Sequence, residues 1–240
     1  MPRQGLLHNA VHARAIRVDG LHGQEEQDGS LTIPLFPLPN VVLFPNVFLP
    51  LHIFEPRYRQ MTADALAGDR IIGMVMLRAG YQADYEGAPP IYATGCSGLI
   101  THHEQLEDGR YNLVLRGLAK FTVSNEHTPP PGRLYRSATI APLEDSLRDG
   151  ERDALRKDRR RLQDLLVPVL QDRLEAAMPA AMPDEELINA LAQYLEFDPM
   201  ERLALLECQG ALARCRSMID LLEMRRMGSG LGDPGSGKIH

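Results

Sequence analysis

Prolines are the feature that most constrains this fold, because they are concentrated in the most apolar part of the chain, residues 31–61. Each proline lacks a backbone N–H and fixes φ, so a continuous helix is excluded there until Pro56, which suits the first position of a helix. Alternating and β-branched residues predict strands over Leu31–Phe36 and Val47–Ile53. The prolines in and between these strands are Pro34, Pro37, Pro39, Pro45 and Pro50.

Further short strands are predicted without alternating helices. Ile71–Leu77 is apolar almost throughout, as expected of a strand that is buried on both faces. A loop over Tyr81–Pro90 follows, and Asp108-Gly109 gives the strongest hairpin signal in the chain. The remaining strand-like segments are Ile91–His103, Tyr111–Leu115, Lys120–Asn125 and Tyr135–Pro142. Roughly six to eight short strands in this pattern predict a closed or half-closed antiparallel sheet.

The pattern changes to helical periodicity near Asp145. Apolar residues on one face predict a helix over Glu151–Met178, which Pro168 is expected to kink. Pro183 is expected to open a second helix and the capping box Asp198-Pro199-Met200-Glu201 a third, with a break at Gly210. A fourth helix is predicted over Ala211–Met227, burying Leu212, Cys215, Met218, Ile219 and Leu222.

Composition indicates a protein of the cytoplasm. The chain has 240 residues and a formal net charge of −6, which argues against nucleic acid or an anionic membrane as the main partner. It has three cysteines without CxxC spacing, which suits a reducing compartment and offers no metal or disulfide framework. No apolar run approaches the ~18 residues that a membrane span needs, and the N-terminus lacks the pattern of a secretory signal.

The stretch beginning at Pro34, PLFPLPxVVLFPxxxLPLHIFEPRYRQM, closely resembles the N-terminal substrate-binding domain of Lon proteases, in particular the small stand-alone proteins that consist of that domain alone. The resemblance extends from about Leu31 to Met224. Further segments that fall in the family's order are Gly73-Met74-Val75, Gly95, Asp108-Gly109-Arg110, Gly117, Phe121-Thr122-Val123, Asp198-Pro199, Arg202-Leu203 and Leu205-Leu206.

The resemblance implies an α+β fold in which an antiparallel, PUA-like β pseudobarrel precedes a C-terminal helical bundle. The expected domains are a flexible arm at 1–30, the pseudobarrel at 31–144, a helical subdomain at 145–227 and a disordered glycine-rich tail at 228–240. The resemblance also implies a non-catalytic module that recognises unfolded or extended polypeptide. A separate protease or chaperone is a further candidate partner. The chain ends before the ATPase and Ser-Lys protease domains of full-length Lon would begin, so no protease activity is expected.

Four residues at the end of the proline-rich stretch are the candidate polypeptide-binding site. In this hypothesis His52, Phe54, Arg57 and Tyr58 edge a groove that holds an extended chain through apolar contacts and strand addition to an open edge. The alternative is structural. Glu55 would pair with Arg57 or Arg59 to tie the strand end to the sheet, while Tyr58 and Met61 would fill the core.

Other motifs suggest no catalytic, metal or cofactor site. The tail matches GxxxxGK but has Ile239 where a P-loop needs Ser or Thr. The adjacent His102 and His103 would point to opposite faces of a strand and cannot chelate one metal together. Cys208 and Cys215 are expected to be packing thiols. The basic run over residues 156–161 is interleaved with acids, which favours a solvated helix face over a site for an anionic partner.

Two other classes of function remain as alternatives. PUA-like barrels often contact RNA, so an RNA-binding module is the main rival, although the net acidity weighs against it. An enzyme is the third hypothesis, and it ranks last because no nucleophile with a neighbouring base, carboxylate pair or cofactor motif can be named in the sequence. A small-molecule pocket between the two lobes also stays open.

Overall fold

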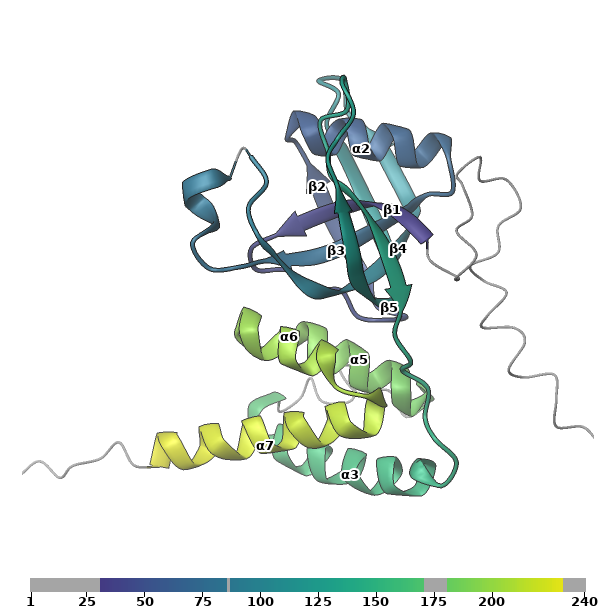
Figure 1. Ribbon diagram of the computed structural model, residues 1–240. Helices are drawn as coiled ribbons and strands as arrows, with labels where there is room; N and C mark the ends of the chain where they lie inside the picture. The colour runs from purple at the N-terminus through teal and green to yellow at the C-terminus, as the bar shows by residue number, and fades with distance from the viewer. Residues whose placement is uncertain (1–30, 86, 171–180, 231–240) are drawn as a thin grey trace, which may run out of the picture.

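The computed structural model describes residues 31–85, 87–170 and 181–230. Its first half is a six-stranded sheet in the order β2-β5-β4-β3-β1-β6, and a further pairing of β6 with β5 closes the sheet into a ring from which β2 extends. The strands are β1 (Leu31–Leu38), β2 (Phe48–Ile53), β3 (Ile71–Leu77), β4 (Ile91–Gln105), β5 (Tyr111–His127) and β6 (Ser137–Pro142). Helix α2 (Pro56–Ala67) lies on the opposite side of the ring from the helices of the C-terminal half, and the short 3-10 helix Tyr81–Asp84 lies to one side (Figure 1). The predicted fold class, a β structure followed by helices, is confirmed.

The sheet is mixed, because β1 and β3 run parallel, with Leu35 opposite Gly73. The other paired strands are antiparallel, as predicted. Parallel neighbours need a crossover of about a dozen residues or more, and here β2 and α2 supply it. The pattern of strand lengths does not show which strands become neighbours, and this pairing was not foreseen.

The ring has a seam where β6 separates from β1. The pairing reaches Pro34 and ends with a hydrogen bond from the Leu35 N–H to the Arg136 carbonyl, at 2.8 Å. Alternate residues of a strand face the same neighbour, so Pro37 also faces the seam, where its missing N–H costs no ladder hydrogen bond. Its carbonyl instead accepts the Tyr58 hydroxyl, at 3.2 Å. The proline spacing of β1 is therefore matched to the place where strand pairing stops.

Strand β5 is one continuous element, although two segments, Tyr111–Leu115 and Lys120–Asn125, are predicted for it. It continues through Gly117, where a Cβ would lie 2.0 Å from the carbonyl oxygen of Phe44, so only glycine allows this close approach. The first part of β5 pairs with β2 and the last part with β6, while β4 occupies its other edge. This strand therefore joins the ring to the β2 extension.

The helical half begins with α3 (Glu151–Leu170), which contains Pro168, and its predicted continuation to Met178 lies outside the described residues. The further helices are α5 (Asp184–Tyr194), α6 (Pro199–Glu207) and α7 (Gly210–Gly230). The predicted capping box of Asp198 and Glu201 is present at the start of α6. Gly210, at φ 87°, is the first residue of α7. The arm at 1–30 and residues 231–240, which hold the P-loop-like motif, also lie outside the described residues.

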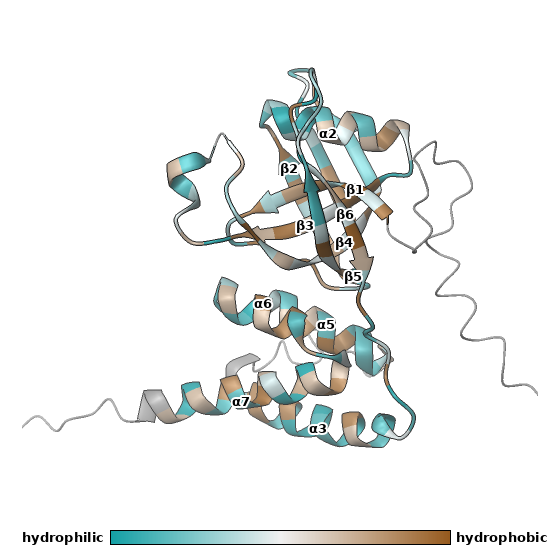
Figure 2. Cartoon of the chain, viewed as in Figure 1, coloured by the Kyte–Doolittle hydropathy of each residue, from teal (hydrophilic) through white to brown (hydrophobic). Residues whose placement is uncertain are grey.

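Helices α5 and α6 lie next to the sheet, with α3 and α7 beyond them (Figure 1). Hydrophobic and hydrophilic residues alternate along α3 and α7, as expected of helices with one buried face (Figure 2). One cluster of buried apolar residues extends from Met61 and Phe44 in the β half to Leu187 and Leu205 in the helical half. The two halves therefore share a core.

A buried polar cluster also joins the two halves, at the start of the helical segment. Arg214, which is 0% exposed, donates from Nη2 to both carboxylate oxygens of Asp145, at 2.9 and 3.1 Å. Lys120 of β5, 2% exposed, pairs with the same carboxylate at 2.7 Å and donates to the Cys208 carbonyl at 2.6 Å. Asn189 accepts from Arg214 and donates to the Pro45 carbonyl. These bonds fix the position of the helices relative to the sheet.

None of the helices in the described part of the chain combines the length and apolar content that crossing a bilayer requires.

Candidate functional site

An open groove of about 550 Å³ lies against β2, β5 and β4, close to the hairpin that joins β4 to β5. Its apolar lining residues come from β2 and β5, namely Pro50, Leu51, Leu113 and Val114. The polar lining residues are His52, His102, His103, Glu104 and Asn112. A volume of this size is within the range of ordinary ligand sites, and its openness to solvent suits an extended chain better than an enclosed small molecule.

A row of hydrogen-bonded side chains crosses three strands at the groove. His52 Nδ1 lies 2.8 Å from Asn112 Oδ1, and Asn112 Nδ2 donates to Glu104 at 3.1 Å. Arg110 Nη1 lies 3.3 Å from His52 Nε2. Because an arginine can only donate, His52 accepts at Nε2 and donates from Nδ1 to Asn112. The row holds His52 in one orientation beside the apolar groove residues.

Phe54 extends the groove surface beyond β2. Phe54 is 60% exposed, and its ring is stacked on the His52 ring, with centroids 6.3 Å apart. Large exposed aromatic side chains next to a polar partner are typical of binding surfaces. Two of the four predicted residues, His52 and Phe54, are therefore neighbours at the groove.

The outer edge of β2 is poorly suited to pairing with an added β-strand. The Gly117 N–H donates to the Val47 carbonyl at 2.9 Å, so in the antiparallel alternation Phe48, Pro50 and His52 face the outer edge. Pro50 has no N–H, and the Phe48 carbonyl already accepts the Tyr194 hydroxyl. Contacts at this site therefore have to come mainly from side chains and not from an added strand.

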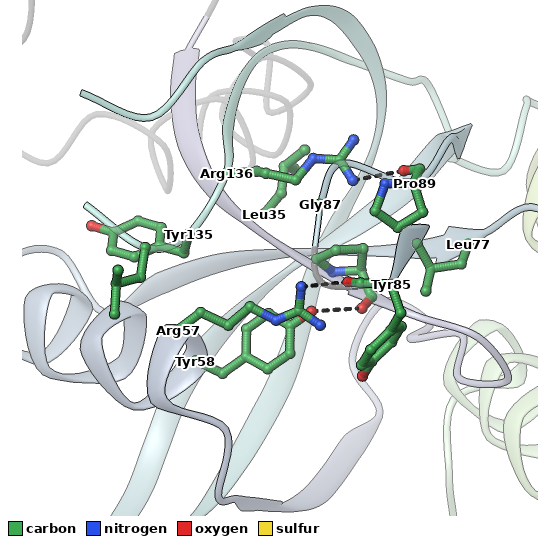
Figure 3. Close-up of a pocket in the computed structure, with 11 residues that line it drawn as sticks. Leu35, Arg57, Tyr58, Leu77, Tyr85, Gly87, Pro89, Tyr135 and Arg136 are labelled. Atoms are coloured by element: carbon green, nitrogen blue, oxygen red, sulfur yellow. Dashed lines mark hydrogen bonds between the residues drawn. The ribbon is translucent and has the colours of Figure 1, made fainter. Parts of the chain in front are cut away.

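Arg57 and Tyr58 lie elsewhere, at the seam between β1 and β6 (Figure 3). Tyr58 is 4% exposed and packs on Phe36, with ring centroids 4.5 Å apart. The Arg57 guanidinium pairs with Glu55 at 2.9 Å and lies 4.7 and 4.6 Å from the ring centroids of Tyr58 and Tyr85. Burial raises the pKa of the Tyr58 hydroxyl, and burial followed by the hydrogen bond to Glu55 raises that of Tyr85. Both hydroxyls therefore stay protonated at neutral pH.

The structure thus divides the predicted site into two places. His52 lines the open groove and Phe54 stacks on His52, whereas Arg57 and Tyr58 line a narrow slot, in the positions that the structural alternative describes. Met61 is also buried, and Glu55 is the partner of Arg57. The role of the four residues in binding stays a prediction.

Several groove residues were not assigned to this site from the sequence. His102 and His103 both line the groove and are exposed, even though they are consecutive in β4. The pairing is regular from His102 onward, with His102 opposite Val114 and His103 opposite Leu113, so the two side chains leave the strand on opposite faces. The polar residue Asn112 gave no signal of its own, because its place in the row depends on strand pairing. No group of three or more metal-ligating side chains is found within the described residues.

The basic run on α3 is largely engaged by acids. Arg159 and Arg161 pair with Asp184 and Glu223, and Arg216 of α7 pairs with Asp158. These exposed or half-exposed pairs are typical of a solvated helical face. They leave little unbalanced positive charge for an RNA backbone on this side.

The described residues thus form a ring of strands with a helical half packed against it and an open groove on β2, β5 and β4. Residues 32–224 match the family model for the ATP-dependent protease La (LON) substrate-binding domain, and the chain belongs to this family. The match is to that domain and to no ATPase or protease domain.

Lon proteases are among the relatives of this chain. The chain is 27% identical over 206 residues to Lon protease 2 of Myxococcus xanthus, and 26% identical over 206 residues to the Lon protease of Anaeromyxobacter dehalogenans. Each alignment covers 84% of this chain and 24% of the relative. The chain therefore spans about a quarter of the length of these relatives.

Solved structures share the fold. A Lon N-terminal domain protein from Xanthomonas campestris superposes with a TM-score of 0.53 at 23% identity, covering 79% of this chain and 98% of that one. The N-terminal domain of the Mycobacterium avium complex Lon protease gives a TM-score of 0.61 at 16% identity, covering 80% of this chain and 98% of that one. At these identities the likeness concerns the fold.

Proposed function

We propose that this chain is a non-catalytic module that binds unfolded or extended polypeptide in the groove formed by β2, β5 and β4. The observation that carries the proposal is an open groove with an apolar lining and an exposed, stacked Phe54 at its border, in a chain of the LON substrate-binding family. Family membership supplies the class of ligand. The groove supplies a surface of suitable size and chemistry for it.

Side chains are expected to account for most of the binding energy. Pro50 and Val114, which are cross-strand partners on one face, offer apolar contact to a bound segment, and the polar row anchored by His52 offers hydrogen bonds to its backbone. The blunted edge of β2 favours weak binding that depends little on sequence. Such binding is what delivery of many different unfolded chains requires.

The proposed partners are unfolded protein segments and a separate protease or chaperone that receives them, in the cytoplasm. The division into a β lobe at 31–144 and a helical lobe at 145–227 is part of this proposal. The helical half would then offer a second surface for the receiving protein, since the groove lies on the β half.

The test is a substitution in the groove with a matched substitution elsewhere. Val114→Lys places a charge among the apolar groove residues, whereas Val167→Lys makes the same change on α3, where Val167 is 48% exposed. Affinity for a reduced and alkylated, permanently unfolded protein is measured by fluorescence anisotropy. We expect Val114→Lys to weaken binding by about tenfold or more, and Val167→Lys to leave it unchanged.

Two results would count against the proposal. Wild-type protein that shows no saturable binding at high micromolar concentration would remove the polypeptide-binding function. Equal loss in the two valine variants would separate the function from this groove. Circular dichroism of both variants checks that the fold is retained.

A further inference from the structure

The seam slot differs from the groove in size and charge. The slot has about 30 Å³ of room for atoms the size of a water oxygen. One water molecule needs roughly 10–15 Å³ on this measure, so about two such atoms fit. A large apolar side chain does not fit inside it, whereas a carboxylate group does. The slot therefore suits a small polar group and not an extended chain.

Two arginines from different elements line this slot (Figure 3). Arg57 comes from the first turn of α2 and Arg136 from the segment before β6, and their side chains are only 16% and 12% exposed. Arg57 donates to the Tyr85 carbonyl and Arg136 to the Pro89 carbonyl, at 2.9 and 2.8 Å. These contacts fix both guanidinium groups before any ligand arrives, so little rotamer entropy remains to be lost on binding.

Donors remain at both arginines after these contacts. A guanidinium has five N–H groups. Arg136 donates from Nη1 to the Pro89 carbonyl and from Nη2 to Glu126. Among the described residues, no acceptor is found for its Nε–H. The Glu126 side chain is 38% exposed, so water can take over its solvation if another acid replaces it. Arg57 is different, because its partner Glu55 is 20% exposed and is also held by the Tyr85 hydroxyl.

We propose that the slot between Arg57 and Arg136 binds a carboxylate group, which displaces Glu126 from Arg136. Two planar oxygens match the size of the slot and the fork geometry of a guanidinium. Leu35, Leu77 and the 57% exposed Leu134 line the same slot and favour an apolar group next to the carboxylate. The carboxylate can come from a polypeptide C-terminus or from an acidic side chain. This site is separate from the groove and does not depend on the function proposed for it.

The experiment follows the arginine Nε–Hε signals of the full chain by NMR during titration with N-acetyl-leucine. N-acetyl-leucine amide, which lacks the carboxylate, is the matched control ligand. We expect the signals of Arg57 and Arg136 to shift in a saturable way with the acid and not with the amide. Amidated N-acetyl-glutamate serves as a third probe, and tighter binding of N-acetyl-leucine assigns the source as a chain terminus, whereas the reverse assigns an acidic side chain.

Substitution of Glu126 gives the sharper test, because it predicts a gain. Glu126→Gln removes the competing carboxylate and should tighten binding of N-acetyl-leucine by about tenfold, while Glu107→Gln, the same change at an exposed residue of the hairpin, should have no effect.

Arg136→Gln should weaken binding by about tenfold, and Arg152→Gln on α3 should not. Equal shifts with acid and amide, or unchanged affinity in Glu126→Gln, would overturn the proposal. Val114→Lys should leave this binding intact, which separates it from the groove.

Discussion

Substitution of Asp145 by asparagine should strongly destabilise the protein. Asp145 is the carboxylate shared by Arg214 and Lys120, which are 0% and 2% exposed, so neutralising it leaves two buried cations without their counter-ion. Breaking a buried pair by removal of one partner costs about 3–5 kcal/mol. Asparagine keeps one acceptor oxygen, so we expect the lower end, about 3 kcal/mol. For a chain of this size that corresponds to a fall in Tm of about 6–12 °C.

The assay is thermal and urea unfolding monitored by circular dichroism, with Asp164→Asn as the matched control. Asp164 is exposed on α3, so its substitution should change the unfolding free energy by no more than about 0.5 kcal/mol. A double-mutant cycle with Lys120→Met should show coupling, because one of the two unpaired cations is then removed. If Asp145→Asn unfolds within 1 °C or so of wild type, the polar cluster does not join the two halves in the way described.

Two further predictions concern packing. Gly117→Ala should cost about 1–3 kcal/mol or more in unfolding free energy, measured by urea denaturation, since its Cβ would lie 2.0 Å from the Phe44 carbonyl oxygen; a neutral effect would contradict the close approach. Burial raises the pKa of the Cys96 and Cys215 thiols to about 12, so the reactive thiolate is scarce at pH 8 and alkylation of native protein should occur first at the part-exposed Cys208. Mass spectrometry of the alkylated chain checks this, and rapid modification of Cys96 would refute its burial.

Local rules predicted the elements of this fold well. Ile71–Leu77 has the predicted bounds, Pro56 opens α2, and the capping box of Asp198 opens α6, because each depends on neighbouring residues only. The parallel pairing of β1 with β3 and the continuity of β5 through Gly117 depend on contacts between distant segments. Sequence periodicity does not contain that information.

The candidate site shows the same limit. The proline-rich stretch drew attention to four residues that are close in sequence, His52, Phe54, Arg57 and Tyr58. They lie in two separate places in the structure, because the chain turns from β2 into α2 between Phe54 and Arg57. The lining residues contributed by β4 and β5 carry no motif. Arg214 was missed because a charged residue on a helix is expected to be exposed, and only the position of Asp145 explains its burial.

Site-specific photo-cross-linking tests the central claim most directly. A photoreactive amino acid is placed at His102, in the groove, or at Lys157, exposed on α3, and each protein is irradiated with the permanently unfolded ligand. The account predicts saturable cross-linking from position 102 and background levels from position 157. Equal yields at the two positions, or a strong product from position 157 alone, would show that unfolded chains bind elsewhere on this protein.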